Sequence, residues 1–404
     1  IKNFTFFSKI FIKSPLKNKS DWFNLQIDHS IWDYSNLMLN ENNLKKNIFV
    51  KLYSLFVCLK KINLARDLVR RNVLYAFIGH SVYFSRALMA QLRKNGVEIY
   101  NQTSFNIYKQ PYKKDRFWSE IKKKDLKKLN KLNLLNLSQK YWKLRSKGKG
   151  HYQDSQLAIK KTKKFNIKEK NFVFLHIFRD SPFNIIDKQR IFDDYFEWFI
   201  ETIKIINKSN EKWYLKFHPS HKLWGEDQEK IINILLKKHN LKLGKNIKIE
   251  NDKLSNQDIF KKAKRILTFS GTPHLEIAGY GIKPIVISKN TLEAFDSSKV
   301  LKPRSIDHYK QLLLINSESK IFKLKIKEIY LARKLLFIRE NILTLKQDLD
   351  SFITYRRDTK KNILKELNII KKNSLKNYKN LFFLGYNLRK LKRTISFKYI
   401  KYYI

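Results

Sequence analysis

The middle of the chain alternates between short apolar blocks and longer amphipathic blocks. The apolar blocks are rich in β-branched and aromatic residues, as buried parallel strands are, and the blocks between them have helical spacing. The predicted strands are 172–178, 212–217, 247–249, 265–269 and 284–287, and the predicted helices are 189–208, 226–239, 256–263 and 273–279. This order predicts an α/β domain with a parallel sheet, whose ligands bind at the carboxyl ends of the strands.

An earlier segment has the same character. Residues 71–78 indicate a strand, 84–95 a helix that ends at Gly96, and 97–100 the next strand. This βαβ unit predicts a Rossmann-like domain over residues 1–150.

The other segments are basic. Residues 109–147 are Lys-rich and helical in pattern, and the flexible stretch 147–150 opens a linker that we place at 151–170. This stretch is not a phosphate-binding P-loop, because no Gly-Lys-Ser/Thr follows it. The second Rossmann-like domain is then predicted over 171–305, and a helical, basic C-terminal extension over 306–404.

The most informative residues follow the fourth predicted strand of the second domain. Ser270, Gly271 and Thr272 form a small-residue turn, in which the backbone can approach a ligand and two hydroxyls can hydrogen-bond to it. Pro273 suits the first position of a helix, whose N-terminal N–H groups favour phosphate. Glu276 lies one turn further on a similar face, where a carboxylate can accept hydrogen bonds from both hydroxyls of a ribose.

Two other strands of this domain end in candidate functional residues. Lys216 and His218 share one face of their strand by alternation, and Pro219-Ser220 makes the turn that follows. Asp180 follows the first strand of the domain. Because the strands are parallel, we expect Asp180, His218 and the turn at Ser270 to meet at one edge of the sheet.

These motifs resemble those of a known enzyme family. Ser-Gly-Thr, Glu276 and a later Gly-x-x-Pro resemble the donor-site signature of GT-B glycosyltransferases, which sugar-nucleotide epimerases share. Residues 213–220 are similar to the strand and His-Pro motif of bacterial capsule and surface-polysaccharide transferases. Residues 172–182 and 192–198 resemble the first strand and helix of that family's C-terminal domain, and the resemblance covers roughly 170–300.

The resemblance implies two Rossmann-like domains that face each other, with a nucleotide-sugar bound mainly by the C-terminal one. It implies metal-independent, inverting transfer to a growing surface polysaccharide or a lipid-linked acceptor. Asp180 would deprotonate the acceptor, and His218 would stabilise the departing phosphate. The expected nucleotide-sugar ligands are Lys216, Ser220, Ser270, Gly271, Thr272 and Glu276. A CMP-activated ulosonic acid is one candidate donor, beside UDP- and other sugars.

Alternatives stay open. A His or Asp at a strand end also occurs as a structural or turn residue, and Glu276 also fits a helix surface. Asp154 in the linker and His80 after the first strand are further candidates for the base, and Arg179 stands where the family pattern has a smaller residue. The Asp-x-Asp at 348–350 resembles a metal motif of the other large glycosyltransferase fold, but it lies in a helical pattern. We therefore expect no metal, and no cofactor beside the donor.

Composition narrows the class of protein. The 404 residues are 43% hydrophobic and 14% aromatic, which is enough for two cores. Cys58 is the only cysteine, which excludes an internal disulfide and fits a reducing cytoplasm. No apolar run is long enough to span a bilayer. The expected location is the cytoplasm, peripheral on the inner face of the inner membrane.

The net charge of +50 favours an anionic partner, although a bias toward Lys, Asn and Ile codons explains it equally well. A membrane surface is one such partner, which the basic, aromatic tail 381–404 would contact. A nucleic-acid-binding protein is the second hypothesis for function, against which no zinc-finger, RRM or helix-turn-helix motif is present. A sugar-nucleotide epimerase or an inactive scaffold is the third.

Overall fold

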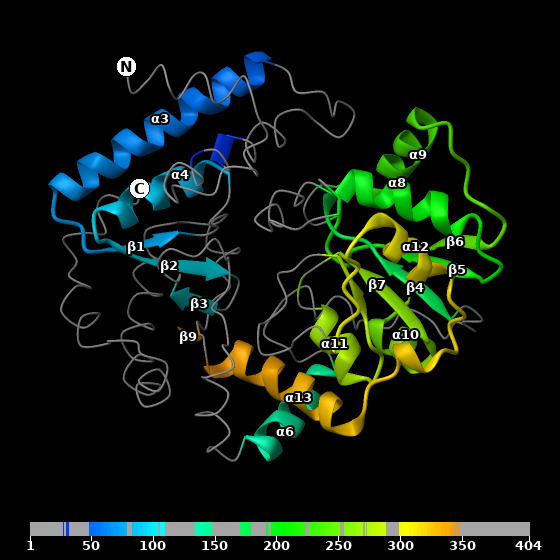
Figure 1. The fold of residues 1–404 in the computed structure, drawn as a ribbon. Helices are drawn as coiled ribbons and strands as arrows, with labels where there is room; N and C mark the ends of the chain where they lie inside the picture. Colours follow the sequence, from blue (N-terminus) through cyan, green and yellow to red (C-terminus); the bar gives the residue numbers. More distant parts are fainter. Residues whose placement is uncertain are drawn as a thin grey trace. The chain divides into compact units, whose positions relative to one another are not determined.

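The structure, a computed structural model, has two compact units of mixed α/β architecture with parallel strands in each (Figure 1). The first unit contains Ile1–Ser119 and Arg339–Ile404, and the second contains Glu120–Ile338. The structure describes residues 27, 30–31, 48–78, 83–103, 106–109, 134–147, 170–178, 191–192, 195–222, 226–250, 254–269, 271, 273–287, 299–342 and 345–346.

The first unit holds a four-stranded sheet in the order β1-β2-β3-β9. Its strands are β1 (Tyr75–Ile78), β2 (Glu98–Thr103), β3 (Asn106–Lys109) and β9 (Leu345–Lys346). The first two are parallel and are joined through helix α4 (Phe84–Lys94), which confirms the predicted βαβ unit. The other pairs are antiparallel, and β9 is a strand in a segment predicted to be helical.

A long helix, α3 (Ile48–Arg70), packs along α4 in this unit (Figure 1). The residues buried between them include Leu55, Cys58 and Ile62 from α3 with Ala87 and Ala90 from α4. The small alanines allow the two helix backbones to approach closely. The sequence pattern did not predict this helix.

The second unit holds a five-stranded parallel sheet in the order β6-β5-β4-β7-β8. Its strands are β4 (Asn171–Phe174), β5 (Trp213–Lys216), β6 (Ile247–Glu250), β7 (Arg265–Thr268) and β8 (Ile285–Val286). Its helices are α6 (Leu135–Arg145), α8 (Tyr195–Ile206), α9 (Gln228–Lys238), α10 (Asn256–Lys262), α11 (Pro273–Gly279), α12 (Ile306–Leu314) and α13 (Ile326–Phe337). The predicted alternation of strands and helices is confirmed.

Helices cover both faces of this sheet, and the central strands β4 and β7 are buried at every position (Figure 1). Val173 and Leu215 pack with α8, α9 and α12 on one face. Phe174 and Ile266 pack with α10 and α11 on the other face, which we call the α11 face. Because side chains alternate along a strand, these clusters also determine on which face each polar residue near the strand ends lies.

Arg265, at the start of β7, joins the sheet to α12. Its side chain is fully buried, and its Nη1 donates to the backbone oxygens of Leu312, Leu313 and Ile315 at 3.1, 2.8 and 2.6 Å. It also forms an ion pair with Glu211. Burial lowers the pKa of Arg265 to about 10, and Glu211 opposes this shift. A guanidinium here satisfies the last carbonyls of α12 and opposes the negative end of its dipole.

Helix α6 belongs to the second unit, although the predicted bound at residue 150 placed it in the first domain. The ring of Trp142 lies directly against Gly279 of α11, so that a Cβ at that position would overlap it. Arg333 of α13 donates to the Gly279 oxygen at 2.9 Å and to Gln139 Oε1 at 3.0 Å. These contacts hold α6, α11 and α13 together. The domain bounds themselves stay a prediction.

Candidate functional site

The candidate site lies at the carboxyl edge of the five-stranded sheet, on the α11 face. Tyr214 packs with the cluster on this face, so Lys216 and His218, two and four positions further along, lie on the same side. Thr268, the last residue of β7, lies two positions after Ile266 and therefore on the same face. His176 lies two positions after the end of β4. The structure thus brings together side chains from three neighbouring strands, as the sequence predicted for Lys216 and His218.

His218 is held in one orientation by the turn that follows it. Its Nδ1 accepts a hydrogen bond from the backbone N–H of Ser220 at 3.2 Å. In the neutral ring the proton is therefore on Nε2, which is the nitrogen that can donate to a ligand oxygen. The ring is partly exposed, and Ser220 is buried. The hydrogen bond from the Ser220 backbone therefore orients the imidazole without a ligand.

Gln228, the first residue of α9, joins the ends of two strands. Its Oε1 accepts from the backbone N–H of His218 at 2.8 Å, and its Nε2 donates to the backbone oxygen of His176 at 2.7 Å. Its Nε2 also donates to Glu226 Oε1 at 2.9 Å, and the same oxygen accepts from the N–H of Phe178 at 3.0 Å. Gln228 and Glu226 are both buried. Fully satisfied buried networks of this kind fix backbone positions.

Neither residue was predicted from the sequence as part of the site. Polar residues at the start of a helix normally cap that helix and remain in contact with solvent. Asp227, which lies between Glu226 and Gln228, does cap α9: it accepts from the Lys230 N–H at 3.1 Å. The only signal available was that Gln228 follows the His-Pro motif at close range. It could not show that the amide is buried.

His176 also lies at this edge of the sheet, where it contacts Thr268 and Tyr195. Its Nε2 lies 2.9 Å from Thr268 Oγ1, and its ring packs on Tyr195 with a centroid distance of 5.1 Å. Burial, together with the smaller effect of nearby His218, lowers the pKa of His176 to about 3. The ring is therefore neutral at neutral pH. The sequence motif contained His176, but no role was predicted for it.

Gly271 packs directly over this histidine. Its φ is +87°, a conformation in which residues with side chains are strained, and an added Cβ would lie 3.5 Å from His176 Cε1 and 3.3 Å from Pro273 Cδ. Glycine is therefore favoured here by its backbone conformation, and the predicted close approach to a ligand stays a prediction. Helix α11, which the turn opens, is only seven residues long, so its dipole is a minor source of positive charge.

Lys216 is the principal cation of the edge, since its side chain is buried near the end of β5. It lies in register with Phe174 on one side and Glu250 on the other. A buried ammonium group acts through a low dielectric, where its attraction for an anion is screened weakly. The role of Lys216 in binding phosphate stays a prediction.

Glu276 lies in a partly buried ion pair, and not on an open helix surface. Its Oε1 accepts from Arg145 Nε at 2.6 Å and also contacts Arg145 Nη2. The side chains of Arg145 and Glu276 are 4% and 13% exposed. Arg145 comes from α6, and a third contact, from its Nη1 to the Tyr141 hydroxyl at 3.5 Å, steadies it. The sequence did not predict this partner, and the ribose role of Glu276 stays a prediction.

Several predicted site residues lie outside the described residues. They are His80, Asp154, Arg179, Asp180, Ser270, Thr272 and the Asp-x-Asp at 348–350. Their roles stay predictions. In the described part of the chain, no three or more His, Cys, Asp or Glu residues gather closely enough to hold a metal ion. No described helix is long and apolar enough to cross a membrane.

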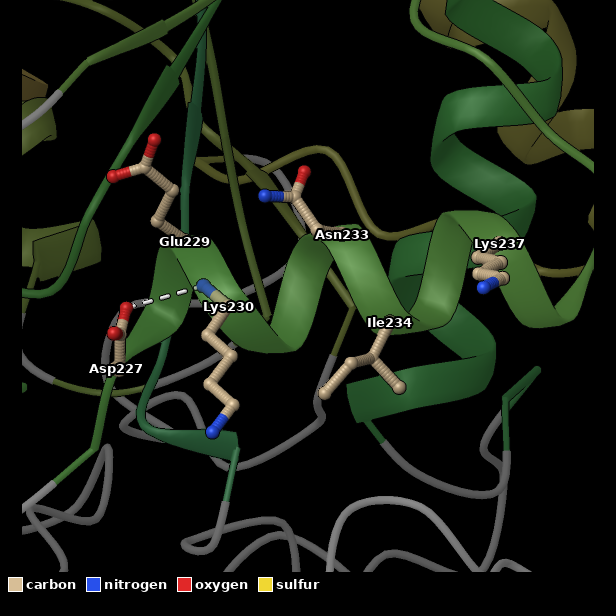
Figure 2. A pocket seen from close by; sticks show the side chains of 6 residues that line it. All are labelled: Asp227, Glu229, Lys230, Asn233, Ile234 and Lys237. Atoms are coloured by element: carbon tan, nitrogen blue, oxygen red, sulfur yellow. Dashed lines mark hydrogen bonds between the residues drawn. The ribbon is translucent and has the colours of Figure 1, made fainter.

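A hollow of about 410 Å³ lies along the outer side of α9 (Figure 2). Figure 2 shows its lining: Asp227, Glu229, Lys230, Asn233, Ile234 and Lys237. All six residues come from α9 and its N-cap, with acidic side chains at the start of the helix and lysines further along it. It lacks the convergence of several elements that marks a binding site, and it is separate from the histidines of the sheet edge.

Comparisons with known proteins give little further information. No family model and no curated protein matches the chain. Among solved structures, the Thermosulfurimonas dismutans KpsC β-Kdo 2,4 transferase is similar with a TM-score of 0.37 and 12% sequence identity, over 64% of this chain and 78% of that one. A similarity this low carries no argument about fold or activity.

Proposed function

We propose that this chain is a glycosyltransferase that moves a sugar from a nucleotide-sugar to a growing surface polysaccharide or a lipid-linked acceptor, with its two units in a GT-B arrangement. The observation that supports this most is the gathering of Lys216, His218 and the Gly271 turn at the carboxyl edge of one parallel sheet. Such an edge is where parallel α/β sheets bind nucleotides.

The chemistry of the edge suits a departing nucleotide. Sugar transfer leaves negative charge on the phosphate as the glycosidic bond to it breaks. The Nε2–H of His218 would donate to a phosphate oxygen, and Lys216 would supply a fixed positive charge beside it. Donors that are oriented before the reaction stabilise such charge without reorganising.

The residues around these donors favour preorganisation. Gln228 holds the backbone of His218, and Ser220 orients its ring. His176 is neutral, so it supports the Gly271 turn without adding a second charge. In this proposal Asp180 deprotonates the acceptor hydroxyl, Ser270 and Thr272 bind phosphate, and Glu276 binds the ribose.

Nucleotide binding tests the proposal first. We expect at least one of CMP, CDP, UDP and GDP to raise the unfolding temperature, because a ligand at about 100 times its Kd stabilises the folded state by about 2.7 kcal/mol. The variant His218→Gln should lose most of this shift. His239→Gln is the matched control, because His239 is exposed at the far end of α9. No shift with any nucleotide, or an equal shift in His218→Gln, would overturn the site.

Turnover separates the proposal from the alternatives. Mixed with a nucleotide-sugar, the protein should release the free nucleotide, slowly to water and faster with an acceptor. Loss of the His218 donor should lower kcat by about a hundredfold, the typical effect of removing one such donor. An epimerase would change the sugar without releasing the nucleotide. A nucleic-acid-binding protein would bind DNA or RNA with a steep salt dependence and leave the nucleotide-sugar unchanged.

A further inference from the structure

Helix α3 exposes an unusual set of large apolar side chains. Phe49 is 75% exposed, Phe56 57% and Tyr53 48%. These residues are spaced four and three positions apart, so they form one line on the surface of the helix. Ile48, Leu59 and Leu64 are also exposed beside them. Single exposed apolar residues are ordinary, but a contiguous row marks a surface that contacts something other than water.

The second half of the same helix is basic. Lys60, Arg66 and Arg70 are exposed, and Asp67 is the only acidic residue among positions 48–70. Lys60 Nζ lies 5.6 Å from the centre of the Phe56 ring, where the apolar row meets the basic half. Asp67, whose carboxylate lies 3.4 Å from Arg70, offsets one unit of this charge.

We propose that α3 lies on the surface of an anionic phospholipid bilayer, with its aromatic row in the interface and its basic half against the phosphates. The proposal goes beyond sugar transfer and does not depend on it. Interfacial helices combine exposed aromatic side chains with exposed Lys and Arg, and α3 carries both along its length. The net charge of +50 adds long-range attraction to such a surface.

Two other occupants fit the face less well. Two copies of the chain, each with a net charge of +50, would repel one another as they approach. A nucleic acid would be attracted by the charge, but it would leave exposed Phe49 and Phe56 unexplained at one end of the helix. A bilayer surface uses both halves.

Vesicle sedimentation with the full chain tests the aromatic row first, because replacing these residues leaves the net charge unchanged. The parent should bind phosphatidylglycerol-containing vesicles, and part of this binding should survive high salt. Phe49→Ser/Phe56→Ser should weaken binding by about tenfold or more and remove the salt-resistant part, because apolar insertion is not screened. Leu135→Ser/Leu137→Ser is the matched control, since both leucines are exposed on α6. These surface changes should leave the unfolding temperature nearly unchanged.

The basic half is tested separately. Lys60→Gln/Arg66→Gln/Arg70→Gln should weaken binding by roughly fivefold per charge at low salt. A triple Lys→Gln variant at 230, 237 and 238, on α9, removes the same charge elsewhere and should have a much smaller effect. Vesicle binding that is equal in the parent and the phenylalanine variant would overturn the proposal. So would a dimer that the phenylalanine variant converts to monomers while no variant changes vesicle binding.

Discussion

The ion pair between Arg145 and Glu276 is the most direct test of how the second unit is built. We consider Arg145→Met, which keeps the aliphatic volume of the side chain and removes its charge. The change leaves the Glu276 carboxylate, 13% exposed, without the guanidinium that donates to it at 2.6 Å. It also removes the link between α6 and α11 that crosses 131 positions of sequence.

The expected cost follows from burial. Removing one partner of a buried ion pair typically costs about 3–5 kcal/mol, because the other charge stays desolvated. Glu276 keeps some access to water, so we expect about 3 kcal/mol, the lower end of that range. For a unit of this size the unfolding temperature should fall by about 2–4 °C per kcal/mol, which gives roughly 6–12 °C.

Thermal and urea unfolding of four proteins provide the assay: the parent, Arg145→Met, Glu276→Gln and the double variant. The two single changes should not add, and the coupling should be about 2 kcal/mol. Lys143→Met is the control, because Lys143 is two positions away on the same helix and is exposed. A loss below about 0.5 kcal/mol in Arg145→Met would refute the reasoning, since that is the effect of a solvent-exposed pair.

The same variants separate the two roles of Glu276. If its carboxylate also binds a ribose, Glu276→Gln should reduce the preference for a ribonucleotide over the matching 2′-deoxyribonucleotide, which a purely structural glutamate would not affect. The Lys143→Met control should keep the full preference. An unchanged preference in Glu276→Gln would leave the ion pair as the only role of this residue.

Two further predictions follow from buried groups. Arg265→Met should cost about 3–5 kcal/mol, because Glu211 and the last carbonyls of α12 lose their donor; a loss below about 1 kcal/mol by urea unfolding would contradict this. The pKa of His176 is about 3 in the folded state and about 6.5 when unfolded, so the unfolded chain binds the extra proton between these values and stability falls as the pH drops from about 6.5 to 3. This fall is on the order of 4 kcal/mol and should be reduced in His176→Gln, measured by urea unfolding at several pH values; an unaltered pH profile would contradict the assignment.

The second unit could be predicted from the sequence because its strands are buried on both faces. Blocks such as 172–175 and 284–287 are almost wholly apolar, the other strands have apolar centres with polar residues at their ends, and amphipathic helices separate the strands. Helix α3 could not be predicted in the same way. Its outward face carries Phe49 and Phe56 where an ordinary surface helix carries polar residues, so the contrast between its two faces is weak.

The site was predicted only in part, for a related reason. Alternation along a strand is enough to place Lys216 and His218 on one face, because it is a local rule. The burial of Gln228 and the neutrality of His176 depend on what packs against them, which sequence spacing does not contain. The turn at Gly271 was predictable because a positive φ limits the residue type, and glycine is the usual solution.

Helix α6 is the clearest case in which sequence spacing did not predict the tertiary contacts of a helix. Its sequence predicted only a Lys-rich helical stretch before the linker, whereas Trp142 lies against Gly279 and Arg145 reaches Glu276. The sequence signal for these contacts was the aromatic ring of Trp142 in a Lys-rich helix, because a large aromatic side chain usually packs against another part of the protein. Because Arg145 precedes the linker predicted after residue 150, the glutamate proposed to bind ribose depends on a residue from the other side of that linker. Cutting the chain there would leave the second unit with its parallel sheet but without the partner of Glu276.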